Sequence, residues 1–313
     1  MKHRFLPLFI LPFCLASCSK TSLERKVFCF DTMVEIKLSD GSEEDLDHLE
    51  KIFARYDQLS DNYRERNVKN VFSINNTIED VTVDADLYQL LKTTFEFENP
   101  YFNPLCGSLS KAWKESLNNN QILSSDTITS LLEKMNSTNL NFKDNNVVQK
   151  NGEAEIDLGA IAKGYALDQV KSYLDEKQYK HYLVNAGYSS ILLGEKDSDD
   201  GIYRVGIKNL PNSYLELKNC YVSTSGISEQ SSVIDGITYS HIVNPNNGST
   251  VAQYDCVLVV SNSGAIGDAL STSFMLSSIN EIKEAETSFG VKSIVIQNSN
   301  IIYQHPELEV KKL

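Results

Sequence analysis

Residues 155–168 constrain the fold most, because within this stretch the apolar pattern changes from that of a strand to that of a helix. The expected short strand ends at Gly159, and small apolar residues then recur every four positions. Asp157 precedes the turn, and Lys163 lies in the first helical turn, where free backbone N–H groups and the helix dipole favour anions. The stretch is therefore either a structural strand–turn–helix with a solvated lysine or the edge of an anion-binding site.

Strand and helix patterns are mixed along the rest of the chain without strict alternation, which indicates an α+β fold. Apolar residues at helical spacing predict helices at residues 43–56, 84–97, 109–113, 125–135, 265–277 and 279–289. Strand patterns occur at residues 27–38, 140–142, 147–149, 182–186, 190–193, 202–207, 215–218, 221–223, 239–243, 256–261, 293–297 and 301–304. The sequence shows no internal repeat, so we expect one domain over residues 27–313.

The N-terminus is typical of an exported protein. A positively charged start is followed by an apolar run at residues 5–16, which is too short to span a bilayer as a helix. The run ends in Leu-Ala-Ser before Cys18 and resembles a bacterial lipobox. We therefore expect residues 1–17 to be a lipoprotein signal peptide, Cys18 to carry lipid and residues 18–26 to be a tether. The alternative is an ordinary signal peptide that contains cysteines.

This anchor would place the protein in the bacterial cell envelope, facing the periplasm or the outer side of the plasma membrane. The formal net charge of −13 argues against a nucleic-acid partner and against electrostatic docking on anionic lipid, so the N-terminal lipid would be the only membrane contact. The cysteines that follow Cys18 are Cys29, Cys106, Cys220 and Cys256. They are too widely spaced for a zinc framework or a dense disulfide scaffold.

Two groups of residues have the composition of a catalytic site. Asp268 and Thr272 stand four apart in a predicted helix and share a face, where their oxygens suit Mg²⁺. The same pair is compatible with a carboxylate near a helix start and a threonine that bonds its own backbone. His241, in the predicted strand 239–243, is either a general base or a half-buried strand histidine. Residues 222–226 are predicted to be a strand that runs into a hydroxyl-rich turn, which is either a phosphate-binding turn or an ordinary polar turn.

Five sequence blocks, in order along the chain, resemble those of the ApbE family, the FAD:protein FMN transferases. The first, Asp-Leu-Gly-Ala-Ile-Ala-Lys-Gly-Tyr-Ala at residues 157–166, is similar to the family signature. The others are Leu-Val-Asn-Ala-Gly at 183–187, Thr-Ser-Gly at 224–226, His-Ile-Val-Asn-Pro at 241–245 with Gly248, and Asp-Ala-Leu-Ser-Thr at 268–272. Residues 60–75 and 102–113 resemble further family regions, so the likeness covers residues 27–304.

The resemblance implies an exported α+β domain with a flavin cleft. It implies Mg²⁺-dependent cleavage of FAD, transfer of FMN through a phosphoester bond to a Thr or Ser of an acceptor protein, and release of AMP. The implied acceptor is an exported, flavin-carrying subunit of electron transport.

The resemblance also assigns roles by position. Asp268, Thr272 and a backbone carbonyl near Ala160 would bind Mg²⁺. His241 would act with Asp268 in catalysis and would deprotonate the acceptor hydroxyl. The residues that would line the cofactor site, with Tyr63 stacked on the flavin, are Tyr63, Asp157, Lys163, Asn185, Thr224 and Ser225.

Two positions depart from the family pattern. Tyr188 follows Asn-Ala-Gly where the family has glycine, and Ile227 follows Thr-Ser-Gly where it has aspartate. A tyrosine at position 188 is expected to crowd a place where backbone approaches the ligand. Two further hypotheses therefore stay open, namely hydrolysis of FAD to FMN and AMP, and a lipoprotein that binds flavin without chemistry.

Overall fold

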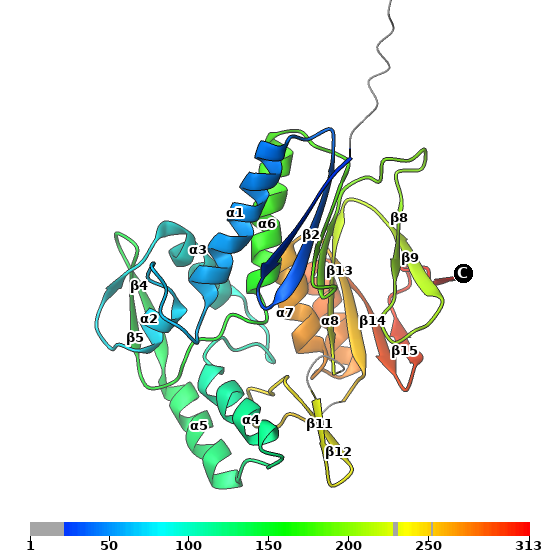
Figure 1. Cartoon of the computed structure of the whole chain (residues 1–313). Coiled ribbons are helices and arrows are strands. Elements are labelled where there is room, and N and C mark those ends of the chain that lie inside the picture. Colours follow the sequence, from blue (N-terminus) through cyan, green and yellow to red (C-terminus); the bar gives the residue numbers. More distant parts are fainter. Residues whose placement is uncertain (1–21, 228–230, 252) are drawn as a thin grey trace, which may run out of the picture.

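The structure is a computed structural model in which residues 22–227, 231–251 and 253–313 are described (Figure 1). The predicted signal peptide, Cys18 and the first part of the expected tether lie outside the described residues. Within the described ranges, no helix has both the length and the apolar character needed to cross a membrane.

An eight-stranded antiparallel sheet forms the centre of the molecule, in the order β1-β2-β6-β7-β10-β13-β14-β15 (Figure 1). Its strands are β1 (Ser22–Cys29), β2 (Thr32–Ser39), β6 (Tyr182–Ala186), β7 (Ser190–Leu193), β10 (Cys220–Gly226), β13 (Cys256–Ser261), β14 (Lys292–Gln297) and β15 (Asn300–Gln304). Every residue of β13 is buried, because alternate side chains belong to apolar clusters on the two faces of the sheet.

Four helices with apolar faces accompany this sheet: α1 (Glu43–Ser60), α6 (Ala162–Glu176), α7 (Gly264–Phe274) and α8 (Ile279–Phe289). The α7 helix packs on β10 and β13 and also on α6, which in turn packs on α1. The start of α1 is well defined, since Ser42 and Asp45 form a reciprocal capping box. This packing brings the N-terminal ends of α6 and α7 together over the sheet (Figure 1).

Smaller elements surround this core. The short sheets are β16-β9-β8 (Lys311–Lys312, Ser213–Leu217, Tyr203–Gly206), β3-β5-β4 (Val81–Thr82, Val147–Asn151, Asn139–Lys143) and β11-β12 (Ser231–Ile234, Ile237–Ser240). The remaining helices are α2 (Val71–Asn75), α3 (Ala85–Glu96), α4 (Gly107–Asn118) and α5 (Ser125–Ser137). The indole N–H of Trp113 donates to the Gly248 carbonyl at 2.7 Å, which joins α4 to the loop after β12.

The predicted α+β class is confirmed, and five local expectations need correction. Residues 222–226 all lie in β10, so the hydroxyl-rich segment is strand rather than turn. Residues 22–26 are the first part of β1 rather than a tether. Residues 27–38 contain two strands, because Phe30 and Asp31 form a turn with positive φ. Residues 155–158 are irregular rather than a strand, and β12 ends at Ser240, so His241 lies beyond it. All four cysteines of the described chain are free thiols.

Candidate active site

The α6 and α7 helices meet at two glycines. A Cβ atom placed on Gly164 would lie 2.0 Å from the carbonyl oxygen of Gly264, and one on Gly264 would lie 2.3 Å from that of Gly164. Real Cβ atoms do not approach backbone so closely, so this crossing requires a residue without a side chain on each helix. The close approach allows a side chain of α7 to reach backbone groups of α6.

Asp268, on α7, is the side chain that reaches α6 across this close contact. Its Oδ2 accepts a hydrogen bond from the Gly164 N–H at 2.7 Å. Its Oδ1 accepts from the Ser223 hydroxyl at 2.7 Å and the Ser190 hydroxyl at 2.8 Å. The Gly164 N–H is one of the donors that the first turn of a helix leaves without an internal partner, so Asp268 caps α6 from a neighbouring helix.

Burial raises the pKa of the Asp268 carboxyl above its usual value. The positive charge of Lys163 opposes this shift, as do the hydrogen bonds from Ser223, Ser190 and Gly164. Lys163 and Asp268, which are far apart in sequence, therefore share one electrostatic environment. Burial disfavours the charged form of this carboxyl, and a cation beside it would offset that cost.

A group of hydroxyls continues from Asp268 along α7. The Ser225 hydroxyl at the end of β10 lies 2.9 Å from that of Ser271 and 3.1 Å from that of Thr272. The Ser271 hydroxyl donates to the Asp268 carbonyl at 3.0 Å. The structure thus brings the predicted residues Asp268, Thr272 and Ser225 into one oxygen-rich cluster.

Asp157 and Ala160 lie in the segment that leads into α6. Asp157 is half-buried, and its Oδ1 accepts from the Gly159 N–H at 2.8 Å. Burial raises the pKa of the Asp157 carboxyl, while this hydrogen bond and the charges of Lys111 and Lys114 act in the opposite direction. Asp157 is therefore coupled electrostatically to α4, which carries both lysines.

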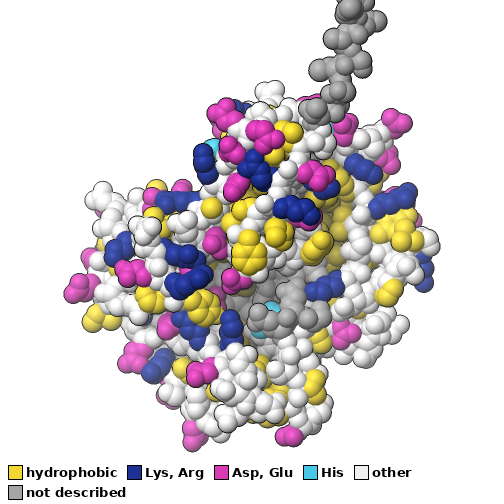
Figure 2. Space-filling model, viewed as in Figure 1, with side chains coloured by type: hydrophobic (Ala, Val, Ile, Leu, Met, Phe, Trp, Pro, Cys, Tyr) yellow, Lys and Arg dark blue, Asp and Glu magenta, His cyan; other side chains and the backbone are white. Residues whose placement is uncertain are grey.

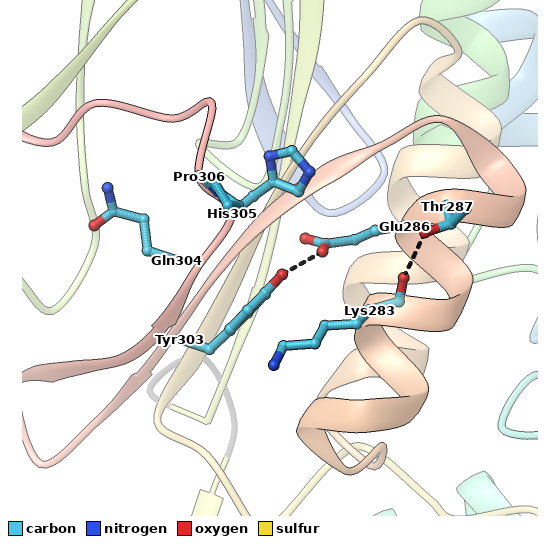
Figure 3. A pocket seen from close by; sticks show the side chains of 7 residues that line it. All are labelled: Lys283, Glu286, Thr287, Tyr303, Gln304, His305 and Pro306. Carbon is cyan, nitrogen blue, oxygen red and sulfur yellow. Dashed lines mark hydrogen bonds between the residues drawn. The ribbon is translucent and has the colours of Figure 1, made fainter.

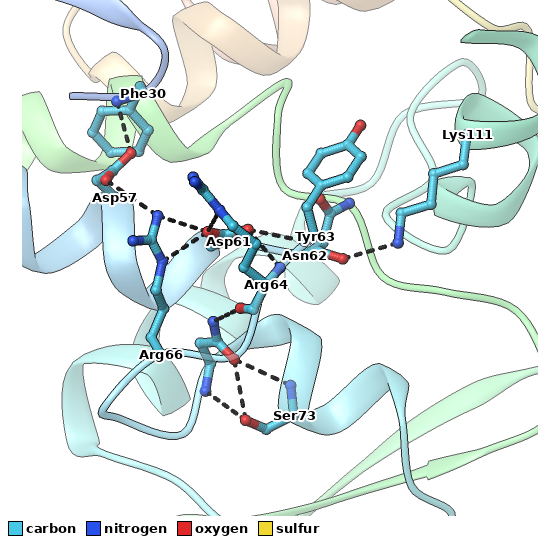
Figure 4. A network of polar contacts seen from close by, with 10 residues as sticks. Phe30, Asp57, Asp61, Asn62, Tyr63, Arg64, Arg66, Ser73 and Lys111 are labelled. Carbon is cyan, nitrogen blue, oxygen red and sulfur yellow. Dashed lines mark hydrogen bonds and ion pairs between the residues drawn. The ribbon is translucent and has the colours of Figure 1, made fainter. Parts of the chain in front are cut away.

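Tyr63 lies in an open groove of about 360 Å³ that is lined mainly by residues of α4. The Nζ atoms of Lys111 and Lys114 lie 5.1 and 5.0 Å from the centre of its ring, and the residue is half-exposed. Lys111 also donates to the Asn62 carbonyl at 2.8 Å, and Asp61 accepts from the Tyr63 N–H at 2.8 Å (Figure 4). A planar aromatic ring flanked by cations suits a planar ligand that carries negative charge.

The hairpin between β6 and β7 lies beside the cluster. The Asn185 Oδ1 accepts from the Tyr188 N–H at 2.8 Å, and the Thr224 N–H donates to the Ser189 carbonyl at 2.7 Å. The latter hydrogen bond joins the β6–β7 hairpin to β10 next to Ser223, and both Asn185 and Thr224 are buried. The predicted cofactor residues Asn185 and Thr224 are thus tied to the strands that hold Asp268.

His241 is exposed and follows the end of β12. It is not among the described hydrogen-bond donors to Asp268, which are Gly164, Ser190 and Ser223.

The space-filling view shows the molecule hollowed at the centre of this face, beneath the β1–β2 hairpin, with charged side chains of both signs around the hollow (Figure 2).

Sequence reasoning missed Gly164, Ser190 and Ser223 as partners of Asp268. A signal existed for Ser190, because a polar residue at the start of an otherwise apolar strand needs a hydrogen-bond partner once buried. Ser223 belongs to a run of three hydroxyl residues in β10 and did not stand out in this way. The role of Gly164 could not be seen locally, since it depends on the crossing with α7.

A second pocket, of about 400 Å³, lies between α8 and β15 and contains none of the predicted site residues (Figure 3). Its buried carboxylate, Glu286, accepts from the N–H and the hydroxyl of Ser293 at 2.7 and 2.8 Å and from the hydroxyl of Tyr303. These donors satisfy Glu286 within the fold, so the pocket has no unpaired carboxylate to offer a ligand.

The fold and the site together define an α+β protein with a buried carboxylate and several hydroxyls at the meeting point of two helix N-termini. The chain belongs to the ApbE family, whose model matches residues 30–294.

Relatives and solved structures agree with this assignment. A protein of Klebsiella pneumoniae named FAD:protein FMN transferase is 29% identical over 245 residues, which cover 72% of this chain and 75% of the relative. One of Chlamydia pneumoniae with the same name is 22% identical over 283 residues, or 87% of this chain and 89% of the relative. The crystal structure of the ApbE protein of Thermotoga maritima has a TM-score of 0.79 and 25% identity, with 91% of this chain and 97% of that chain covered.

Proposed function

We propose that this protein is an FAD:protein FMN transferase, which uses Mg²⁺ to transfer FMN from FAD to a Thr or Ser of an acceptor protein and releases AMP. The observation that carries the proposal is the buried Asp268 carboxylate, which accepts from Gly164, Ser190 and Ser223. Thr272 follows Asp268 by one turn of α7, and its hydroxyl lies 3.1 Å from that of Ser225. The reaction, transfer of FMN from FAD to a protein, is proposed because the relatives are named FAD:protein FMN transferase.

The donor set fits Mg²⁺. Asp268 accepts from three groups, and the hydroxyl of one of them, Ser190, lies within hydrogen-bond distance of both carboxylate oxygens. A cation would take the place that one of these hydroxyl contacts occupies. The side-chain oxygens of Asp268, Ser190, Ser223, Ser225 and Thr272 are hard ligands, which Mg²⁺ prefers. The ion needs only a few protein ligands.

We assign Asp268, Thr272 and the carbonyl of Ala160 to this metal site. Gly164 donates its N–H to Asp268, and Ala160, four residues before Gly164, is the position whose carbonyl would accept that N–H in a continuing helix. When bound, Mg²⁺ would neutralise the phosphate charge that builds up as the pyrophosphate is cleaved.

The protein's own groups supply the remaining parts of phosphoryl transfer, which depends on positioning and on charge stabilisation. Lys163, at the start of α6, pairs with the pyrophosphate, and Tyr63 stacks on the flavin. His241 accepts the proton from the acceptor hydroxyl. The hydroxyl oxygen then bonds to the FMN phosphorus, the bond from that phosphorus to the bridging oxygen breaks, and AMP leaves with that oxygen.

The test mixes the purified protein with FAD, Mg²⁺ and a candidate exported acceptor, and measures the intact mass of the acceptor. We expect the acceptor to gain one FMN group, and we expect Asp268→Asn to lower the rate by about 100-fold or more, because it weakens the binding of the Mg²⁺ that would stabilise charge on the reacting phosphate. The matched control is Asp45→Asn, which changes a buried carboxylate of α1 that accepts from the hydroxyls of Tyr173 and Tyr179.

Two outcomes would contradict the proposal. Equal transfer rates for Asp268→Asn and the control would remove Asp268 from the site. Release of AMP from FAD at the same rate with and without acceptor would identify a hydrolase.

A further inference from the structure

The α6 and α7 helices each cap the other's N-terminus. Asp268 on α7 accepts from the Gly164 N–H of α6 at 2.7 Å. In return, Asp168 on α6 accepts from the N–H groups of Gly264 and Ala265 of α7 at 2.7 and 3.0 Å. In both helices the aspartate follows the contact glycine by four residues, so the exchange is nearly symmetric about the glycine crossing.

The two aspartates differ in their surroundings. Asp268 is buried in the hydroxyl cluster, whereas Asp168 is half-buried and also accepts from the Ser263 hydroxyl, at 3.0 Å. The Tyr221 phenol lies close enough to Asp168 for the carboxylate charge to add to the effect of burial, and both raise the pKa of Tyr221. Asp168 therefore connects the start of α7 to α6 and to β10, the strand that carries Ser223.

We propose that Asp168 is a positioning residue, which sets the place of Asp268 by holding the start of α7 against α6. The proposal rests on the proposed function for its effect on the reaction, but not for its effect on the structure. The glycine contact fixes how closely the two helices approach, and it leaves α7 able to slide along α6. The hydrogen bonds from two successive N–H groups to one carboxylate oppose this sliding. If they are lost, Asp268 moves relative to the Gly164 N–H.

A residue whose only role is to cap a helix would give different effects when it is substituted. Ser263 is the N-cap of α7, and its hydroxyl accepts from the Ile266 N–H. The variant Ser263→Ala removes this cap and the hydroxyl bond to Asp168, but it leaves both backbone N–H donors to Asp168 in place. It is therefore the control for capping, because it weakens the start of α7 while the two backbone links to α6 remain.

The test compares Asp168→Asn, Ser263→Ala and the unmodified protein. Asparagine keeps one acceptor oxygen but turns an amide donor toward the second N–H. We expect Asp168→Asn to speed hydrogen exchange in the peptide that contains Gly164, and to weaken Mg²⁺ binding in calorimetry by about tenfold, as for other residues that orient a metal ligand. In the transfer assay, kcat should fall by a similar factor while KM for FAD stays within about twofold of its original value. Ser263→Ala should lower the melting temperature and leave all three readouts unchanged.

Unchanged exchange at Gly164 in Asp168→Asn would overturn the proposal, and so would equal effects of the two variants. Hydrogen exchange needs neither acceptor nor metal. A protein that transfers no FMN would therefore refute the proposed function while this measurement still decides the role of Asp168.

Discussion

At the scale of single residues, Tyr188 shows how the structure accommodates a departure from the family pattern. It has a φ of 62°, in the left-handed region that favours glycine, and its side chain is 72% exposed. The adjacent Gly187, with a φ of 70°, is the residue that Thr32 approaches closely, since a Cβ there would lie 2.3 Å from the Thr32 hydroxyl oxygen. The tyrosine at position 188 therefore adds backbone strain and gains little from burial on folding.

We predict that Tyr188→Gly raises the melting temperature. A non-glycine residue in the left-handed region costs about 1 kcal/mol, which corresponds to about 1–2 °C for a protein of this size. The control is Tyr188→Ala, which removes the ring but keeps the strain. A melting temperature for Tyr188→Gly below that of Tyr188→Ala, measured by calorimetry, would show that strain is not the dominant effect.

At the scale of elements, the site depends on the crossing of α6 and α7. Apolar periodicity is sufficient to predict both helices, because the pattern is local. It predicts the first two strands as one, because their turn consists of Phe30 and Asp31 rather than of glycine or proline. The crossing itself has no local signature in the sequence, since Gly164 and Gly264 are 100 positions apart.

We predict that Gly164→Ala destabilises the protein by about 1–3 kcal/mol, because the new methyl group would lie 2.0 Å from the Gly264 carbonyl and the helices would have to separate. It should also weaken transfer, because Asp268 would move with α7. The matched control is Gly206→Ala in β8, where a Cβ would have no neighbour within 4 Å. Urea denaturation measures both variants, and equal midpoints would contradict a tight crossing.

At the scale of the whole molecule, the described domain begins close to the expected lipid anchor. Ser22 opens β1 four residues after Cys18, and an extended chain spans at most about 3.5 Å per residue, or about 14 Å in all. We propose that the domain is lipid-anchored through Cys18 in the cell envelope. An exported acceptor would then meet it near the membrane surface.

We predict that Cys18→Ala moves the protein from the membrane fraction to the soluble fraction, because lipid is the only membrane contact that we expect. The control is Cys29→Ala, which changes a buried thiol of β1 and should leave the protein in the membrane fraction. Fractionation followed by immunoblotting measures both. A Cys18→Ala protein that stays with the membrane would contradict the lipid anchor.

The amino-acid sequence is sufficient to predict the α+β class, the positions of most helices and the family, because these depend on local periodicity and on blocks of neighbouring residues. It also predicts Asp268, Thr272 and Ser225 as site residues, and the fold brings the hydroxyls of Ser225 and Thr272 within 3.1 Å of each other. The hydrogen-bond partners of Asp268 can be identified only from the folded chain. Its partners come from α6, β7 and β10, and a hydrogen bond between distant segments depends on how those segments pack. The reciprocal capping by Asp168 belongs to the same level, because it exists only where two helix N-termini meet at backbone contact.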